Sequence, residues 1–176
     1  MNAWSIVDSP VGPLYLEASP LGLHKLAFAS NPRKYERAAA AAPREDAHPQ
    51  AAAHLTEAVR QLREYFEGSR RAFELALDLS GTPFQKRVWQ AIAAIPYSRT
   101  VSYAQLAAAA GAPAAYRAAG AACGANPVAL VVPCHRVVGS DGGLHGFGGG
   151  LPVKRWLLDH EASTVMAAAA RQAVLV

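Results

Sequence analysis

Two helix-start signals in the second half of the chain constrain its fold more than any other feature. In a capping box, a Ser or Thr side chain and a Gln or Glu three residues later satisfy each other's backbone amides at the start of a helix. Such boxes occur at Thr82 with Gln85 and at Ser102 with Gln105. They predict one helix that ends near Ile95 and a second that runs to Gly111.

A third helix is expected from Pro113 to about Gly124, and the glycine-containing turn before it gives the spacing of a helix-turn-helix. This helix is rich in alanine, and Arg117 is its only charged side chain. Helices that read base edges in the major groove usually carry several polar side chains. The composition therefore favours close approach to DNA, with Arg117 entering the duplex or replacing a displaced base. A tightly packed core helix is an equally open interpretation.

The first half is predicted to be a small sheet covered by a helix. Short apolar segments at 4–7, 14–16 and 23–28 are separated by Pro and Gly turns, as strands are. Apolar residues then recur at helical spacing from Pro49 until Gly68.

The remainder of the second half is predicted to carry a buried strand, a loop and a final helix. A strand-like run at 128–132 precedes Cys134, a glycine-rich loop covers 139–150, and a last helix starts at Pro152 and reaches about Glu161. The tail, 162–176, could extend that helix or fray, and its role is left open. The expected fold class is α/β, of the α+β kind: an amino-terminal sheet-and-helix domain at 1–80 and a mainly helical carboxy-terminal domain with the helix-turn-helix at 81–176.

Charge and cysteine usage restrict the function classes. Up to Gly81 the chain has 9 Lys and Arg against 10 Asp and Glu, whereas from Thr82 it has 8 against 3. A basic second half suggests a polyanion such as nucleic acid as the partner, although a solvated basic face is about as common.

No apolar stretch approaches the roughly 20 residues of a membrane span, and the start resembles no signal peptide. A cytoplasmic location with two free thiols is expected.

Cys134 is the candidate nucleophile. Its neighbours His135 and Arg136 carry positive charge that would favour the reactive thiolate, although an inert buried cysteine is the ordinary alternative. Adjacent side chains do not face each other, so a bridging water would carry the thiol proton to His135. A distant carboxylate would orient that ring, and Glu161 is the candidate, with an exposed helix-end glutamate as the alternative.

The glycines of the 139–150 loop allow tight turns and exposed amides that could surround a flat ligand. A phosphate cradle fits less well, because no GK[ST] pattern follows. The six histidines show no zinc-ligand spacing with Cys123 or Cys134, so no metal site and no cofactor are expected.

Taken together, these residues resemble the O6-alkylguanine-DNA alkyltransferases, also called methylated-DNA–protein-cysteine methyltransferases. The order and spacing match throughout the second half, and the first half matches in its general plan. The matching segments are 81–85, 88–89, 95–97, 101–103, 117–120, 126–127, 133–137, 146–150, Lys154, 157–158 and Glu161.

The resemblance implies DNA repair by irreversible, single-turnover transfer of an alkyl group from O6-alkylguanine to Cys134, with O4-alkylthymine left open as a substrate. His135, a water and Glu161 would generate the thiolate, and Asn126 would hold the turn before it. Tyr103 would rotate a phosphate and hydrogen-bond to the leaving guanine. Flipping the damaged base out of the stack makes its alkylated oxygen accessible.

The resemblance also implies a monomer that binds the minor groove of double-stranded DNA. The expected DNA contacts are Arg117, Tyr103, Gln85, Lys86 and Arg136. The expected base pocket consists of Val137, Phe147 and Gly148, with the carbonyls of Cys134 and Val137 accepting from the exocyclic amine.

Three residues depart from the family pattern: Phe147 stands for a tyrosine, Ala129 for a proline in some members, and Tyr116 for a small residue. They would alter the size of the pocket and the range of alkyl groups that it accepts.

Competing functions are a lesion sensor, which would lack the acceptor cysteine, and a methylation-responsive regulator, which would need a cysteine-rich metal domain. A cysteine hydrolase would bring its Cys and His from separate segments.

Overall fold

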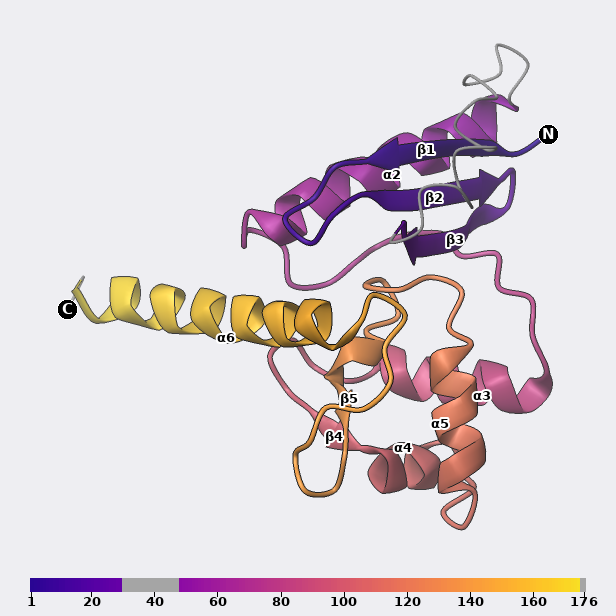
Figure 1. Cartoon of the computed structure of the whole chain (residues 1–176). Coiled ribbons are helices and arrows are strands. Elements are labelled where there is room, and N and C mark those ends of the chain that lie inside the picture. The colour runs from indigo at the N-terminus through magenta and orange to yellow at the C-terminus, as the bar shows by residue number, and fades with distance from the viewer. Residues whose placement is uncertain (30–47, 175–176) are drawn as a thin grey trace.

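The first half of the chain forms a three-stranded antiparallel sheet covered by one helix. The computed structural model describes residues 1–29 and 48–174. Strands β1 (Ala3–Val7), β2 (Leu14–Ser19) and β3 (Gly22–Phe28) pair in the order β1-β2-β3. Helix α2 (Pro49–Phe66) packs across one face of this sheet (Figure 1). The strands and the helix predicted for this half are confirmed.

The second half is mainly helical, and its first two helices begin where the sequence predicts. Its elements are α3 (Pro83–Ala93), β4 (Val101–Ser102), α4 (Tyr103–Ala109), α5 (Tyr116–Gly124), the 3-10 turn η1 (Cys134–Arg136), β5 (Val137–Val138) and α6 (Leu151–Val174). Both capping boxes are formed, with Thr82 and Ser102 as the N-caps of α3 and α4. Strands β4 and β5 pair in parallel.

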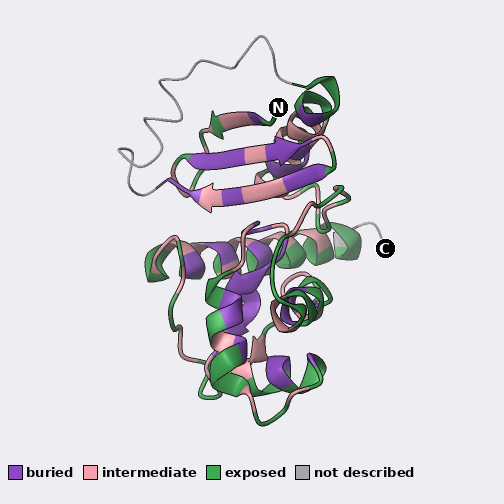
Figure 2. Cartoon of the chain, turned by 90° about the vertical axis from the view of Figure 1, so that its right-hand side faces the viewer, coloured by how far each residue is buried: buried purple, intermediate pink, exposed green. Residues whose placement is uncertain are grey.

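One predicted helix boundary is wrong. Helix α5 starts at Tyr116 instead of Pro113, because residues 112–115 form a separate turn, in which the Ala115 amide donates to the Ala112 carbonyl at 2.8 Å. Helix α6 continues beyond Glu161 to Val174, so the tail extends the last helix, which is one of the two outcomes that the sequence left open. Its last turns carry mainly exposed residues and extend away from the rest of the molecule (Figures 1 and 2).

The predicted strand at 128–132 is also wrong. This run is a buried turn in which Leu130 adopts a left-handed backbone with φ 69° and the Val132 amide donates to the Val128 carbonyl. Asn126 holds it, donating from its side chain to the Val132 carbonyl at 2.7 Å and accepting from the Val128 amide at 3.1 Å. Its β-branched residues therefore indicate burial and not an extended strand.

The edge of β3 that faces away from β2 joins the two halves. The Leu26 amide donates to the Pro127 carbonyl at 2.9 Å, and the Ala129 amide donates to the Leu26 carbonyl at 3.0 Å. Further along the same edge, Leu23 pairs in the same way with the segment around Leu77. The exposed edge of the small sheet is thus paired with the turn that precedes Cys134.

One hydrophobic core extends through both halves. It contains Leu14 and Leu62 from the sheet and its helix, together with Trp89 and Leu157 from the second half. Figure 2 shows buried residues concentrated on the strands and on the inward sides of the helices. Among the helices in the described ranges, none is both long and apolar enough to cross a membrane.

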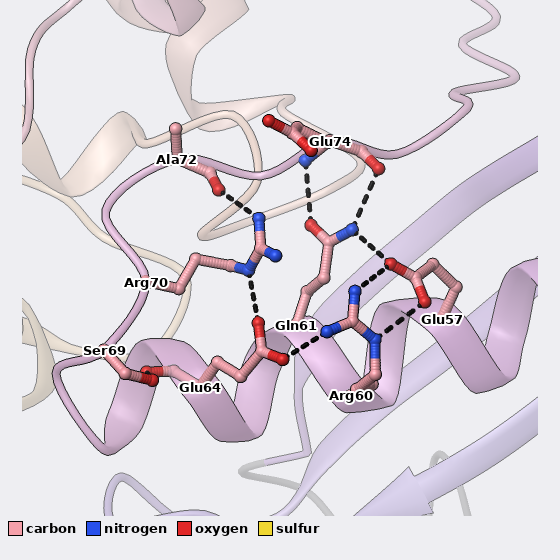
Figure 3. A network of polar contacts seen from close by, with 8 residues as sticks. All are labelled: Glu57, Arg60, Gln61, Glu64, Ser69, Arg70, Ala72 and Glu74. Atoms are coloured by element: carbon pink, nitrogen blue, oxygen red, sulfur yellow. Dashed lines mark hydrogen bonds and ion pairs between the residues drawn. The ribbon is translucent and has the colours of Figure 1, made fainter.

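A polar network fastens the segment after α2 to that helix (Figure 3). The buried Gln61 side chain donates to the Glu74 carbonyl at 2.9 Å and accepts from the Glu74 amide at 2.8 Å. Arg70 bridges the Glu64 carboxylate and the Ala72 carbonyl. These contacts fix the path by which the chain leaves the first half.

Replacement of Gln61 by Ala should loosen this segment. The change removes two hydrogen bonds to the Glu74 backbone, each of which contributes about 0.5–1.5 kcal/mol. We expect the free energy of unfolding to fall by about 2 kcal/mol in urea denaturation, and faster hydrogen exchange at 70–76. Arg60→Ala is the control, because Arg60 pairs with Glu57 on the exposed face. Equal stability of Gln61→Ala and the parent protein would contradict this role.

Candidate functional site

A cavity of about 570 Å³ lies where the sheet meets the helical half. This volume is within the range of small-molecule sites. Its wall is formed by residues of β3, α4, α5 and the two loops around Cys134, namely Leu26, Ala27, Phe28, Tyr103, Gly120, Cys123, Gly124, Asn126, Ala129, Cys134, Gly146, Phe147 and Gly148. Five of the predicted site residues therefore line one cavity, whereas the contribution of β3 was not predicted.

The Cys134 thiol lies in a setting that favours its charged form. Its pKa is lowered by a hydrogen bond from Cys123 and further by Asn126 and the positive charge of Lys154, against the opposing effect of burial. The same contact with Cys134, together with burial, raises the pKa of Cys123. Cys123 therefore acts as a protonated donor to Cys134.

The lowered pKa of Cys134 has a different cause from the one predicted from the sequence, which attributed it to the positive charges of His135 and Arg136. The side chain of His135 is fully buried, and burial lowers its pKa despite the hydrogen bond to Glu161. The imidazole is therefore neutral at pH 7. Arg136 faces away, toward Glu161.

His135 and Glu161 meet as the sequence predicts. The Nε2 atom of His135 lies 2.7 Å from Oε1 of Glu161, and both side chains are completely buried. Burial alone would raise the pKa of Glu161, but hydrogen bonds from His135 and Arg136 lower it to about 2. Glu161 is thus ionised at neutral pH.

The charge of Glu161 determines which nitrogen of His135 carries the proton. An ionised carboxylate only accepts hydrogen bonds, so Nε2 must be the donor and Nδ1 of the neutral ring an acceptor. Within the described part of the chain, this buried Nδ1 has no hydrogen-bond partner. The arrangement provides a proton acceptor next to Cys134 in the chain.

The prediction that Arg136 contacts DNA is wrong. Its guanidinium is buried, with Nε and Nη2 each 3.0 Å from an oxygen of Glu161 and Nη1 donating to the Ile95 carbonyl at 2.7 Å. A buried carboxylate needs such a counter-charge. Arg136 therefore compensates the Glu161 charge inside the protein.

No role was assigned from the sequence to two site residues: Lys154, which was named only as part of the family match, and Tyr65. The fully buried Lys154 ammonium donates to the carbonyls of Val137 and His145 at 2.6 and 2.9 Å. Tyr65, on α2, donates its hydroxyl to Oε1 of Glu161 at 2.9 Å.

A signal for Lys154 was present in the sequence. Lys154, Leu157 and Glu161 follow one another at helical spacing and form one completely buried face of α6. A lysine on such a face needs acceptors inside the protein. The partnership of Tyr65 with a residue 96 positions away has no local signal.

The predicted base-pocket residues lie in different settings. Phe147 and Gly148 line the cavity, whereas the Val137 side chain is buried outside it and the Val137 carbonyl accepts from Lys154. Tyr103 borders the cavity, and its hydroxyl donates to the His145 carbonyl over a long 3.4 Å.

The remaining predicted DNA contacts lie outside the cavity. Arg117 is exposed on α5, its guanidinium 5.7 Å from the centre of the Tyr116 ring. Lys86 is exposed on α3, whereas the Gln85 side chain is engaged at the helix start, accepting from the Thr82 amide at 2.9 Å.

Comparison with known protein families accounts for nearly the whole chain. Residues 83–163 match the family described as "6-O-methylguanine DNA methyltransferase, DNA binding domain". Residues 2–79 match "6-O-methylguanine DNA methyltransferase, ribonuclease-like domain".

Individual relatives agree with this match. A methylated-DNA–protein-cysteine methyltransferase from Methanosarcina barkeri is 40% identical, over 92% of this chain and 98% of the relative. Its counterpart from Mycobacterium tuberculosis is 45% identical, over 93% of this chain and 94% of the relative. The crystal structure of Mycobacterium tuberculosis OGT in complex with DNA has a TM-score of 0.77 and 42% identity, covering 92% of this chain and 93% of that one. The chain therefore belongs to the methylated-DNA–protein-cysteine methyltransferase family, as its second half had indicated.

Proposed function

We propose that this protein repairs DNA by transferring the alkyl group of O6-alkylguanine irreversibly to its own Cys134. One observation carries the proposal: a thiol with a lowered pKa lines a cavity large enough for a base, and the next residue has an unpartnered ring nitrogen backed by an ionised carboxylate. The family of the chain supports the same reaction.

In the proposed mechanism, a water carries the Cys134 proton to Nδ1 of His135. Glu161 holds the ring through Nε2 and stabilises the imidazolium that forms. The lowered pKa of Cys134 reduces the cost of this step. Asn126 acts twice, since it holds the preceding turn and favours the thiolate.

The thiolate then attacks the alkyl carbon in line with its bond to O6. A carbon–sulfur bond forms as the carbon–oxygen bond breaks, and the electron pair goes to the guanine. The guanine anion takes up a proton from solvent, and the proton that His135 accepted returns to solvent. The Tyr103 hydroxyl would hydrogen-bond to the leaving base, giving up its long contact with His145. The product is a thioether, so one molecule repairs one base.

The base would enter the cavity by flipping out of the duplex, which costs a few kcal/mol and less for a poorly paired lesion. Arg117, exposed on the second helix of the helix-turn-helix, would fill the space left in the stack from the minor groove. Lys86 and Gln85, at the start of α3, would contact the backbone nearby, Gln85 after leaving its cap.

Phe147 and Gly148 would border the flipped base. The Cys134 carbonyl accepts from the Val137 amide and the Val137 carbonyl accepts from Lys154, so each keeps one lone pair for the exocyclic amine of guanine. The proposal includes a monomer with two domains, 1–80 and 81–176, that acts in the cytoplasm.

Incubation with a duplex that carries one O6-methylguanine tests the reaction. The intact mass should rise by one methylene unit per protein molecule, and peptide mapping should place the adduct on Cys134. Cys134→Ala should stay unmodified, whereas Cys123→Ala should still react. Repeated turnover, or an adduct on Cys123, would overturn the proposal.

Replacement of Glu161 by Gln should slow methyl transfer about 100-fold at pH 7, because a neutral amide no longer stabilises the imidazolium. The free energy of unfolding should fall by about 3 kcal/mol, since Arg136 loses its buried counter-charge. Asp159→Asn is the control for both measurements, because it removes a negative charge from an exposed position of the same helix α6.

The stability difference between Glu161→Gln and the parent should depend on pH. Folding lowers the pKa of Glu161 from 4.5 to about 2, so its contribution is complete above pH 4.5 and is lost as the pH falls toward 2. Denaturation curves should therefore converge in acid. A constant difference would contradict the assignment of the charge to Glu161.

Arg117→Ala tests base flipping. We expect methyl transfer from duplex DNA to slow at least about tenfold, in line with the few kcal/mol of unstacking, while the reaction with free O6-benzylguanine keeps its rate. Arg171→Ala, on the far end of α6, controls for the loss of one exposed positive charge. Equal slowing with duplex and free base would refute this role.

A further inference from the structure

Strand β3 forms a wall of the reaction cavity. Its residues Leu26, Ala27 and Phe28 border the same space as Cys134. The backbone bonds between Leu26 and the 127–129 segment hold this wall against the turn that leads to Cys134. The first half of the chain therefore contributes a fixed surface to the site.

Phe28 is the largest side chain that β3 contributes to this wall. It is 8% exposed, and its ring centre lies 5.2 Å from that of Phe147, with the planes tilted by 58°. Such a tilted pair is a favourable aromatic contact. The position of Phe147, on the glycine-rich loop, thus depends on a side chain from the first half.

Gly149 shows how closely the loop approaches Phe28. A Cβ atom added at Gly149 would lie 2.9 Å from Cγ of Phe28 and 3.0 Å from Cδ2, closer than side-chain carbons pack. The backbone of Gly149 is not left-handed, so the ring and not the dihedral angles requires glycine here. At the adjacent Gly148, which lines the cavity, a Cβ would meet nothing within 4 Å.

From these contacts we infer that Phe28 is a specificity-determining residue that limits the size of the alkyl group reaching Cys134. The inference rests on the proposed alkyl transfer. Phe28 and Phe147 form an apolar wall, and the Gly149 backbone lies against the Phe28 ring. A methyl group is small enough to make little contact with this wall, whereas a bulky group such as benzyl must fit against it.

A smaller side chain at position 28 should change the choice between substrates. Differences of a few carbon atoms in an apolar pocket alter rates about 10–200-fold. We expect Phe28→Leu to raise the ratio of the single-turnover rates for O6-benzylguanine and O6-methylguanine in duplex DNA about tenfold. The methyl rate should change much less than the benzyl rate.

Phe66→Leu is the matched control, since Phe66 is a half-buried aromatic residue of α2 outside the cavity. It should leave the benzyl-to-methyl ratio unchanged even if stability falls. An unchanged ratio in Phe28→Leu, with both rates lowered together, would show that Phe28 only supports the core and would overturn the inference. Failure of the parent protein to methylate Cys134 would instead refute the proposed function.

Gly149→Ala provides a second, independent test. The added Cβ should push the Phe28 ring into the cavity and lower the benzyl rate more than the methyl rate. In the double variant with Phe28→Leu, the smaller leucine side chain leaves room for the added Cβ, so most of the loss in the benzyl rate should disappear. Additive effects of the two substitutions on the rate ratio would contradict direct contact as the determinant.

Discussion

The buried carboxylate of Glu161 is the interaction on which the rest of the structure depends. Ionised at neutral pH and inaccessible to solvent, it must be compensated by groups of the protein. Three segments supply its four donor groups: the Tyr65 hydroxyl comes from α2, the Ser98 amide from the chain after α3, and the His135 ring and Arg136 guanidinium from the turn η1. The Glu161 carboxylate therefore helps to fix three features: the packing of the two halves, the path of the chain after α3, and the turn that carries Cys134.

The charged groups around Glu161 also determine the protonation state of His135. Burial lowers the pKa of His135 more than the attraction of Glu161 raises it, and the positive charge of Arg136 acts in the same direction as burial, so the ring stays neutral. A neutral ring with its proton held at Nε2 is the form able to accept a proton at Nδ1. The thiolate is favoured separately by Cys123, Asn126 and Lys154. Acid–base and nucleophilic functions therefore rest on different neighbours of the same short turn.

What the sequence predicts well is what local chemistry determines. The starts of α3 and α4 follow from side chains within three residues of each helix start. The pairing of His135 with Glu161, 26 positions apart, was instead predicted from the need of a catalytic imidazole for a carboxylate that orients it. The 128–132 run was misread because its form depends on Asn126 and on Leu26, far away in sequence. The direction in which Arg136 points depends likewise on Glu161, so its charge alone could not reveal its role.

The first half of the chain is part of the reaction site, although its sequence carries no chemical motif. Without β3, the Pro127 carbonyl and the Ala129 amide would lose their partners, and Phe147 would lose the ring on which it rests. Without Tyr65, Glu161 would lose a donor. Each of these contacts joins residues more than 90 positions apart. The motif-bearing half therefore contains the reacting groups, but their positions and the shape of the cavity are determined jointly with a sheet whose own residues react with nothing.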